Sequence, residues 1–268
     1  MLKIALGLEY HGGGYCGWQT QPSGCGIQDV VQQALSSIAE HAVEVVSAGR
    51  TDAGVHALEQ VVHFDTVAER PLSAWVRGTN ANLPNDVAVL WAHAVPAEFH
   101  ARFSARSRSY RYVLLNRPQR AAADYGRVGW FHQPLNVEVM DATARALLGK
   151  HDFSAFRSSE CQAKTPVRTI AECSVYRRDE LVIFEFRADA FLHHMVRNLV
   201  GSLIYVGSGR CSPDWLRDVL QRKDRGLAAP TFAADGLYLT RIGYDSGWGL
   251  PQKSTRFVAS PLAELINH

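Results

Sequence analysis

The spacing of hydrophobic residues divides the first half of the chain into strands and helices. The segment 87–95 alternates apolar and other residues with period two, which predicts a strand. Between Ile27 and Ile38 the apolar residues recur three and four positions apart, which predicts an amphipathic helix. Further strands are predicted at 3–10, 43–48 and 61–66, and a helix after Pro71 that ends before Leu83.

The second half repeats a similar order of elements. Strands are predicted near 106–116, 168–177, 180–188 and 236–244, and helices around 137–148, around 191–206 and after Pro213. Strands mixed with helices in this way predict an α+β fold. We expect two pseudo-repeated split-βαβ halves, of the ferredoxin-like or RNA-recognition type, that share an extended antiparallel sheet. The helices are expected on one face and a catalytic cleft at the centre.

The predicted boundary between the halves falls near 102–107. It gives an N-terminal half of residues 1–105 and a C-terminal half of residues 106–268. The last two dozen residues are rich in Gly, Ser and Pro, which predicts a surface tail.

Composition is typical of a soluble enzyme. With 268 residues, 47% of them hydrophobic, the chain can bury one large core or two smaller ones. No apolar run approaches the ~20 residues that span a bilayer, and the N-terminal apolar stretch is too short for a signal peptide. The five cysteines are an odd number without Cys-x-x-Cys spacing, which predicts neither a disulfide framework nor a zinc site. A reducing cytoplasm is therefore the expected location.

The net charge of +2 is too small to indicate a nucleic-acid-binding protein, but its distribution is uneven. Between Glu98 and Arg120, arginines alternate with aromatic residues and Glu98 is the single acidic residue. Guanidinium groups match phosphate geometry and aromatic rings stack on bases, so this mixture favours RNA. The arginines are Arg102, Arg106, Arg108, Arg111, Arg117 and Arg120.

If 104–115 is a strand, Arg106, Arg108, Tyr110 and Tyr112 share one face, with Arg111 and Val113 on the other. That face would then meet both phosphates and a base. The alternative is a solvated basic face with tyrosines packed at its edge.

The segment Gly-Arg-Thr-Asp-Ala-Gly-Val-His-Ala at 49–57 holds the strongest candidate for chemistry. Its carboxylate, Asp52, lies between two predicted strands, with small residues around it and Arg50 two positions upstream. Loops between rigid strands often carry catalytic groups, and the two glycines allow a ligand to approach the backbone. Gly and Asp are also common in ordinary turns, so these residues alone leave a plain turn open.

This segment resembles the catalytic motif of the tRNA pseudouridine synthase A family, in which the aspartate is essential. Other segments match the family in order, and the resemblance runs from about Ile4 to Leu239. One departure is His11, where the family usually has Asp. The matching segments are 17–19, 60–64, 80–84, 99–104, 110–112 and 193–198.

The resemblance implies an isomerase that converts uridine to pseudouridine at positions 38 to 40 of the tRNA anticodon arm. It implies a homodimer that acts without a cofactor or a metal. Asp52 would attack C1′, remove a C2′ proton to give a glycal, or attack uracil C6; the sequence leaves all three open. In this comparison Tyr110 stacks on the target base and assists proton transfer, Arg50 fills the gap left by the extruded base, and Leu237 forms an apolar wall.

The predicted helix over 191–206 carries a second clue. Arg197 lies among apolar neighbours, where an unpaired guanidinium is costly, so a carboxylate partner is expected. The resemblance names Asp52 as that partner, and an adjacent positive charge favours the ionised carboxylate. On a helix the neighbours His193 and His194 point about 100° apart, so we expect structural or RNA-contacting roles for them rather than metal ligation.

Two other classes of protein remain as alternatives. A non-catalytic RNA-binding protein would explain the arginines but not Asp52. A hydrolase such as a glycosidase normally needs two carboxylates, for which Glu59 and Asp65 are the nearest candidates.

Overall fold

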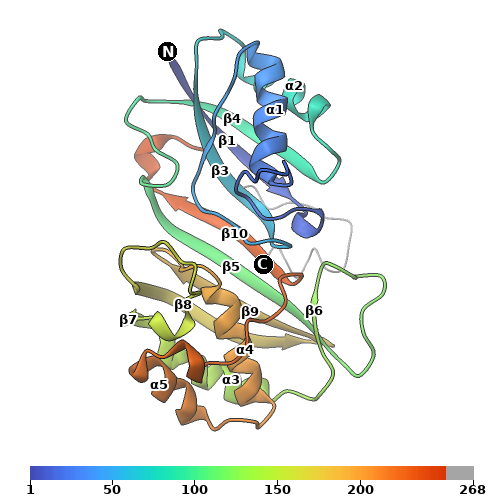
Figure 1. The fold of residues 1–268 in the computed structure, drawn as a ribbon, viewed down its shortest axis with the longest axis vertical. Helices are drawn as coiled ribbons and strands as arrows, with labels where there is room; N and C mark the ends of the chain where they lie inside the picture. The colour runs from blue at the N-terminus through green and yellow to red at the C-terminus, as the bar shows by residue number, and fades with distance from the viewer. Residues whose placement is uncertain (252–268) are drawn as a thin grey trace.

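A computed structural model describes residues 1–251 and places the predicted elements in two halves (Figure 1). The expected tail at the C-terminus falls largely outside the described residues. The elements of the first half are β1 (Leu2–Tyr10), α1 (Ile27–Ala39), β2 (Val46–Ser47), β3 (His56–Thr66), α2 (Leu72–Asn82) and β4 (Val87–Val95). Those of the second half are β5 (Ala105–Asn116), β6 (Gly129–Phe131), α3 (Val137–Ala144), β7 (Gly149–Asp152), β8 (Val167–Arg178), β9 (Leu181–Ala188), α4 (Met195–Gly207), α5 (Pro213–Arg222) and β10 (Leu237–Tyr244).

One sheet runs through both halves in the order β4-β1-β3-β10-β5-β9-β8-β7, which confirms the expected α+β class with a shared sheet. The last strand, β10, lies in the middle of the sheet between β3 and β5 (Figure 1). It pairs antiparallel with β5 but parallel with β3, so the sheet is not antiparallel throughout. The two halves of the sheet are therefore joined through β10.

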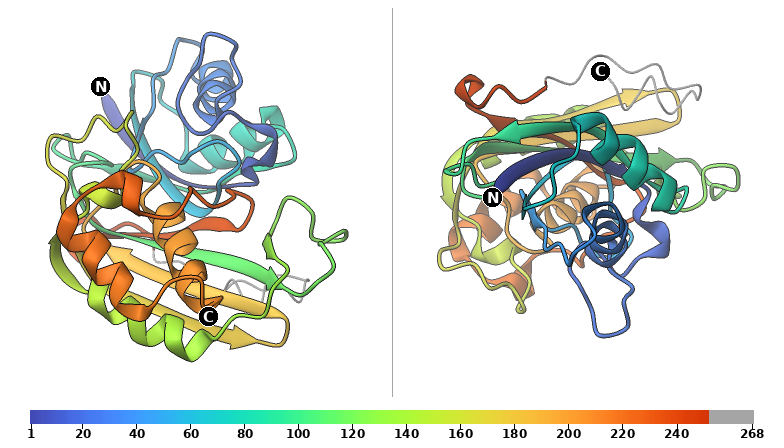
Figure 2. Two further views of the ribbon diagram at one scale, coloured as in Figure 1. Left: turned by 60° about the horizontal axis from the view of Figure 1, so that its bottom comes forward. Right: turned by 90° about the horizontal axis from the view of Figure 1, so that it is seen from above.

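The helices cover one face of the curved sheet, as expected (Figure 2). Two apolar cores lie beneath them. The first contains Leu6, Val31 and Trp75, and the second contains Phe184 and Leu203. Strand β10 contributes side chains to both cores, so the two halves do not bury their apolar surface separately. The division at residue 105 remains a prediction.

Three predicted boundaries were wrong, and the first is the strand expected over 61–66, which as β3 begins five residues earlier at His56. The strand expected over 43–48 is only Val46–Ser47, where a short edge pairs with β3. The helix expected over 191–206 begins at Met195, because His194 takes the left-handed conformation (φ 63°) and acts as its N-cap. His193 and His194 therefore precede the helix, and the helical angle between their side chains does not apply.

The expectation of no disulfide was also wrong. Cys16 and Cys25 are bonded, with their Cα atoms 5.4 Å apart, and the Cys16 N–H donates to the Cys25 carbonyl. A turn of the chain brings them together, which neither the odd cysteine count nor the absence of Cys-x-x-Cys could reveal. Cys161, Cys173 and Cys211 are free thiols.

Reduction of this disulfide is expected to lower the free energy of unfolding by about 2 to 3 kcal/mol, because the short loop between the cysteines gains freedom in the unfolded chain. Urea denaturation with and without dithiothreitol measures the change. The variant Cys16→Ser with Cys25→Ser should show no response to the reductant. An equal response in this variant would contradict the prediction.

Within residues 1–251, no helix is long and apolar enough to cross a membrane.

Candidate active site

Asp52 lies on the loop that leads into β3. Hydrogen bonds from neighbouring segments hold this loop in place. The polar side chains that pin it come from β1 and β3, and the backbone of residue 18 adds a further bond. The hydrogen bonds run from Gln60 Nε2 to the Gly49 carbonyl (2.6 Å), between the hydroxyls of Tyr10 and Thr51 (2.8 Å), and from the Trp18 N–H to the Thr51 carbonyl (2.9 Å). The side chain of Asp52 stays 17% exposed. The carboxylate is thus held in place while remaining accessible.

Two glycines make the turn around Asp52 possible. Gly54 has φ +80°, and the Val55 N–H closes the turn on the Asp52 carbonyl at 3.1 Å. Gly17 packs against the other side of the loop, where a Cβ atom would lie 2.8 Å from the Thr51 carbonyl oxygen. Residues 17 and 54 therefore need to be glycine for reasons of space and backbone conformation.

The imidazole of His56 fixes the end of the loop. Its Nδ1 accepts from the Gly12 N–H (3.0 Å), and its Nε2 lies 2.9 Å from the Asp235 carbonyl, to which it donates. This pattern requires the neutral ring. Burial lowers the pKa of His56 from 6.5 to about 4, partly offset by the bond to Asp235.

Acid is expected to destabilise the fold through His56. Because the pKa is lower in the folded state, the unfolded chain binds more protons between pH 6.5 and 4, so the free energy of unfolding falls as the pH is lowered through this range. The expected loss from His56 between pH 7 and pH 5 is about 2 kcal/mol. Urea midpoints at the two pH values measure it.

The variant His56→Gln is the control for this prediction, since its side chain does not titrate. It should show a shallower pH dependence, with a remainder from His63, whose pKa burial also lowers to about 4. An identical slope in wild type and variant would contradict the assignment.

Asp52 and Arg197 form an ion pair across the two halves. Arg197 Nη1 lies 3.1 Å from Asp52 Oδ2, and the two side chains are 16% and 17% exposed. Arg197 Nε also donates to the Phe232 carbonyl at 2.8 Å, which orients the guanidinium. The structure thus brings together the two residues that the family resemblance paired.

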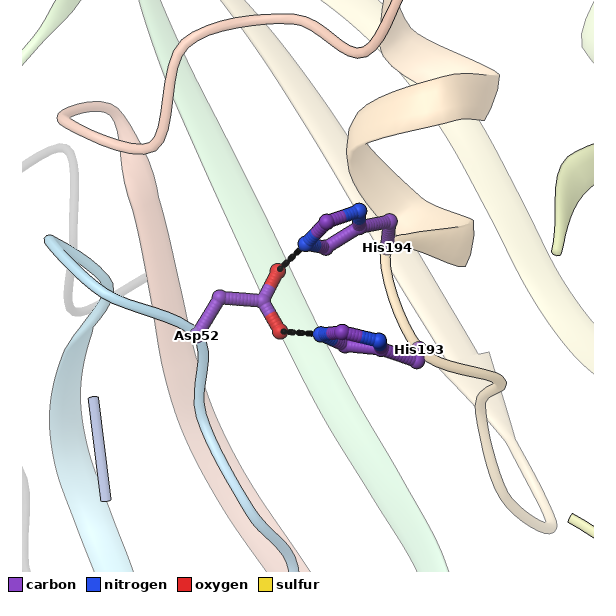
Figure 3. A group of neighbouring side chains, drawn as sticks. All are labelled: Asp52, His193 and His194. Carbon is purple, nitrogen blue, oxygen red and sulfur yellow. Dashed lines mark ion pairs between the residues drawn. The ribbon is translucent and has the colours of Figure 1, made fainter. Parts of the chain in front are cut away.

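His193 and His194 also face Asp52, which we did not expect (Figure 3). His193 Nε2 lies 3.4 Å from Oδ1, and His194 Nε2 lies 3.7 Å from Oδ2. Burial lowers the pKa of His194, and the negative charge of Asp52 offsets only part of this effect.

Among residues 1–251, these three side chains form a group that could hold a metal ion, since one ligand atom from each lies within 4.8 Å of the others. A cation there would share the carboxylate with the guanidinium of Arg197, whose positive charge opposes metal binding.

Tyr110 and Leu237 lie on neighbouring strands of the central sheet. Tyr110, on β5, meets the ring of Phe191 edge-on at 5.2 Å between centroids. Burial raises the pKa of its hydroxyl, and the nearby Tyr10 and Asp52 raise it further. Leu237, on β10, is 4% exposed and packs in the second core.

The predicted RNA-binding arginines fall into two groups. Arg50 and Arg102 are exposed, and the side chain of Arg106 is 72% exposed although it pairs with Asp245 at 2.8 Å. Arg108 is different, because its guanidinium donates to backbone carbonyls. These belong to Ala48, Arg102, Ala105 and Asp189. Arg108 therefore ties segments of the protein together, a role that strand alternation could not reveal.

Along β5, Tyr112 and Arg111 lie on opposite faces, as strand alternation predicts. Tyr112 is fully buried, and its hydroxyl donates to the Ala233 carbonyl. Arg111 lies on the opposite side and pairs with Glu185. Tyr112 is thus a core residue and does not join Tyr110 as a base-stacking candidate.

Several residues of the site were missed in the sequence. Gln60 is fully buried in β3; it opens the matching segment 60–64, but the sequence assigned it no role. Gln162, in the second half, accepts a hydrogen bond from Arg50 Nη1 at 3.5 Å. The pattern of apolar residues around Gln162 gave no sign of this contact. Among the described residues, the ionisable groups paired with Asp52 are a guanidinium and two imidazoles rather than the second carboxylate that a glycosidase needs.

Comparison with known proteins gives a consistent result. The profile of a family described as tRNA pseudouridine synthase matches residues 8–104 and 143–245. The chain is 56% identical over 257 residues to tRNA pseudouridine synthase A of Thiobacillus denitrificans, covering 96% of this chain and 99% of that relative. It is 54% identical over 250 residues to the Nitrosomonas europaea protein of the same name, covering 93% and 92%.

A third relative, tRNA pseudouridine synthase A of Dechloromonas aromatica, is 55% identical over 257 residues, covering 96% of this chain and 98% of the relative. Among solved structures, a Cbf5-Nop10-Gar1 complex aligns with 88% of this chain and 49% of that chain. Its TM-score of 0.40 and identity of 12% are too low to carry an argument.

Proposed function

The chain belongs to the tRNA pseudouridine synthase family and is an isomerase, and on this premise we propose that it modifies uridines 38 to 40 in the anticodon arm of tRNA. The observation that carries the proposal is the Asp52–Arg197 pair on a pinned loop where the two halves meet. This membership favours the enzyme over a non-catalytic RNA-binding protein. The reaction breaks the bond from C1′ to N1, turns the base, and joins C1′ to C5.

Asp52 acts at the glycosidic step, by attack on C1′ or by removal of a C2′ proton; attack on C6 is the third route. Arg197 faces the carboxylate with a positive charge and holds it in position. Tyr110 supports the base by stacking, Leu237 adds an apolar wall, and Arg50 occupies the space that the extruded base leaves. The exposed Arg102 and Arg106 contact phosphates, whereas Arg108 acts by holding the adjoining backbone.

The proposal extends to assembly and location. The enzyme works in the cytoplasm as a homodimer that grips one tRNA, and it needs neither a cofactor nor a metal. The homodimer rests on the resemblance of the chain to its family, and the lack of a cofactor rests on chemistry that involves no net oxidation. The cytoplasmic location rested on the cysteine pattern, which the Cys16–Cys25 bond does not support.

The test is isomerisation of unmodified tRNA, read by carbodiimide labelling and reverse-transcription stops. Stops at positions 38 to 40 are the expected result, after dialysis of the protein against a chelator. Protein that binds tRNA but produces no stop at any uridine would refute the enzymatic function. Activity that is lost on dialysis and restored by zinc, with the tRNA still folded, would instead assign a metal to Asp52, His193 and His194.

Replacing Arg102 and Arg106 by Ala is expected to weaken tRNA binding. The slope of log affinity against log salt should fall by about 0.7 to 0.9 for each phosphate that the variant no longer neutralises. Binding measured by filter retention at several salt concentrations gives the slope. Arg145→Ala with Arg217→Ala is the matched control, because it removes the same charge from exposed arginines near α3 and on α5. If both double variants behave alike, the RNA surface lies elsewhere.

A further inference from the structure

Phe103 is an exposed aromatic residue on the turn that joins β4 to β5. It is 76% exposed, whereas Phe99, at the start of the same connection, is fully buried. A single exposed apolar residue is common on protein surfaces. The surroundings of the ring therefore decide whether it has a role.

The turn that carries Phe103 is held by its own hydrogen bonds. His100 Nδ1 accepts from the N–H groups of Arg102 and Phe103, each at 3.2 Å. Ser104 closes the turn, because its N–H donates to the His100 carbonyl at 2.8 Å and its hydroxyl accepts from the His100 N–H at 3.1 Å. Burial lowers the pKa of His100, which favours the neutral ring that can accept these bonds. The backbone of Phe103 is thus fixed before any ligand binds.

Three rings lie in a series that runs from the interior to the surface. His63 is buried, and its centroid lies 4.9 Å from that of His100. His100 in turn stacks on Phe103 at 4.2 Å, with 28° between the ring planes. The stacking supports the Phe103 ring from the protein side and leaves most of the residue open to solvent. Unpaired RNA bases stack on aromatic rings presented in this way.

Arg108 places this turn beside the loop of Asp52. Its Nη2 donates both to the Arg102 carbonyl (2.8 Å) and to the Ala48 carbonyl (2.9 Å), so these two backbone segments meet at one nitrogen. Its Nη1 donates to the Asp189 carbonyl (2.8 Å) in the second half. Ala48 precedes Asp52 by four residues, which span at most about 14 Å. The turn therefore lies beside the candidate active site.

We propose that Phe103 is a stacking site for an unpaired base of the tRNA anticodon loop. The inference rests on the proposed function. The guanidinium carbon of Arg102 lies 5.9 Å from the centroid of the ring, and both Arg102 and Arg106 are exposed. One nucleotide can therefore place its base on the ring and its phosphate against a guanidinium. A base held there fixes the loop and helps to place the target uridine at Asp52.

The experiment compares two substitutions of Phe103 by filter binding of unmodified tRNA at several salt concentrations. Phe103→Leu keeps an apolar side chain but removes the ring, and it should bind about 5- to 150-fold more weakly than wild type. Phe103→Trp keeps a ring and should bind like wild type. The slope of log affinity against log salt should be unchanged in Phe103→Leu, because stacking neutralises no phosphate.

Tyr125→Leu is the matched control, since it removes another exposed ring, in the segment between β5 and β6, and should keep wild-type affinity. Urea denaturation of Phe103→Leu should match that of wild type, because the lost ring is largely exposed.

A second measurement identifies the base. It uses tRNAs assembled from synthetic fragments, each lacking one base of the anticodon loop. At one position, loss of the base should weaken binding to wild type but not binding to Phe103→Leu, because both changes remove the same contact.

Four results would overturn the inference. Additive losses at every loop position would show that no base contacts the ring. Equally weak binding by Phe103→Trp and Phe103→Leu would exclude stacking. Equal losses in Phe103→Leu and Tyr125→Leu would show that any exposed ring has this effect. Altered sedimentation of free Phe103→Leu would assign the ring to a contact between two copies of the chain.

The proposed function is tested separately. Wild-type protein that shows the coupling between Phe103 and a loop base but isomerises no uridine would refute the enzymatic function and leave the stacking site in place. Isomerisation without any such coupling would refute the stacking site alone.

Discussion

Asp52→Asn is expected to reduce isomerisation at least about a thousandfold while leaving tRNA affinity within a few fold. An amide can neither attack C1′ nor take a proton. Phosphate contacts dominate affinity for tRNA, and Asp52 contributes no positive charge to them. Reverse-transcription stops after carbodiimide labelling measure the first quantity, and filter binding measures the second.

The matched control is Asp65→Asn, which changes an exposed carboxylate on β3, the strand that the Asp52 loop leads into. Asp65 pairs with Lys3 at 3.5 Å and its side chain is 48% exposed, so its loss should leave turnover unchanged. Full turnover by Asp52→Asn would refute the assigned role. Equal losses of turnover and affinity in Asp52→Asn would make the residue part of the binding surface.

Arg197→Met is the second change with a large expected effect, since it leaves Asp52 without its guanidinium partner. The ion pair is largely buried, so removing one partner should lower the free energy of unfolding by about 3 kcal/mol or more. Turnover should also fall, because the carboxylate loses the hydrogen-bond donor that positions it. Urea denaturation and the labelling assay measure the two effects.

The double variant Asp52→Asn with Arg197→Met separates the pair from the individual side chains. It should be less destabilised than Arg197→Met alone, because no unpaired carboxylate remains. Arg197→Lys keeps the charge but cannot donate to both Asp52 and the Phe232 carbonyl in the same way. It should retain more stability than Arg197→Met. Equal stability of the single Met variant and wild type would mean that the two histidines satisfy Asp52 by themselves.

Most elements were predictable because they depend on local periodicity. The alternation at β4 and the three- and four-residue spacing in α1 each reflect one buried face, and the structure has both elements close to the predicted bounds. The small strands β6 and β7 have three and four residues, too few for periodicity to show. The start of α4 was misplaced because the apolar spacing continued backwards past His194, whose left-handed backbone ends it.

The candidate site was predictable in part. The glycines around Asp52 and the apolar setting of Arg197 are local signals, and the family resemblance linked the two residues. Nothing local showed that His193 and His194 face the same carboxylate, since that depends on where α4 begins and how β3 meets the second half. Arg108 was expected on the RNA surface because alternation describes the direction of a side chain but not its hydrogen-bond partners.

The sequence by itself determined most of the helices and strands, the α+β class and the candidate catalytic motif at 49–57, because each depends on residues close together along the chain. The tertiary structure decided which distant groups share one place. It inserted β10 between β3 and β5, joined Cys16 to Cys25, and surrounded Asp52 with Arg197 and two imidazoles. These contacts arise when the two halves bury their apolar surfaces against the shared sheet, and that packing is a property of the whole chain rather than of any segment.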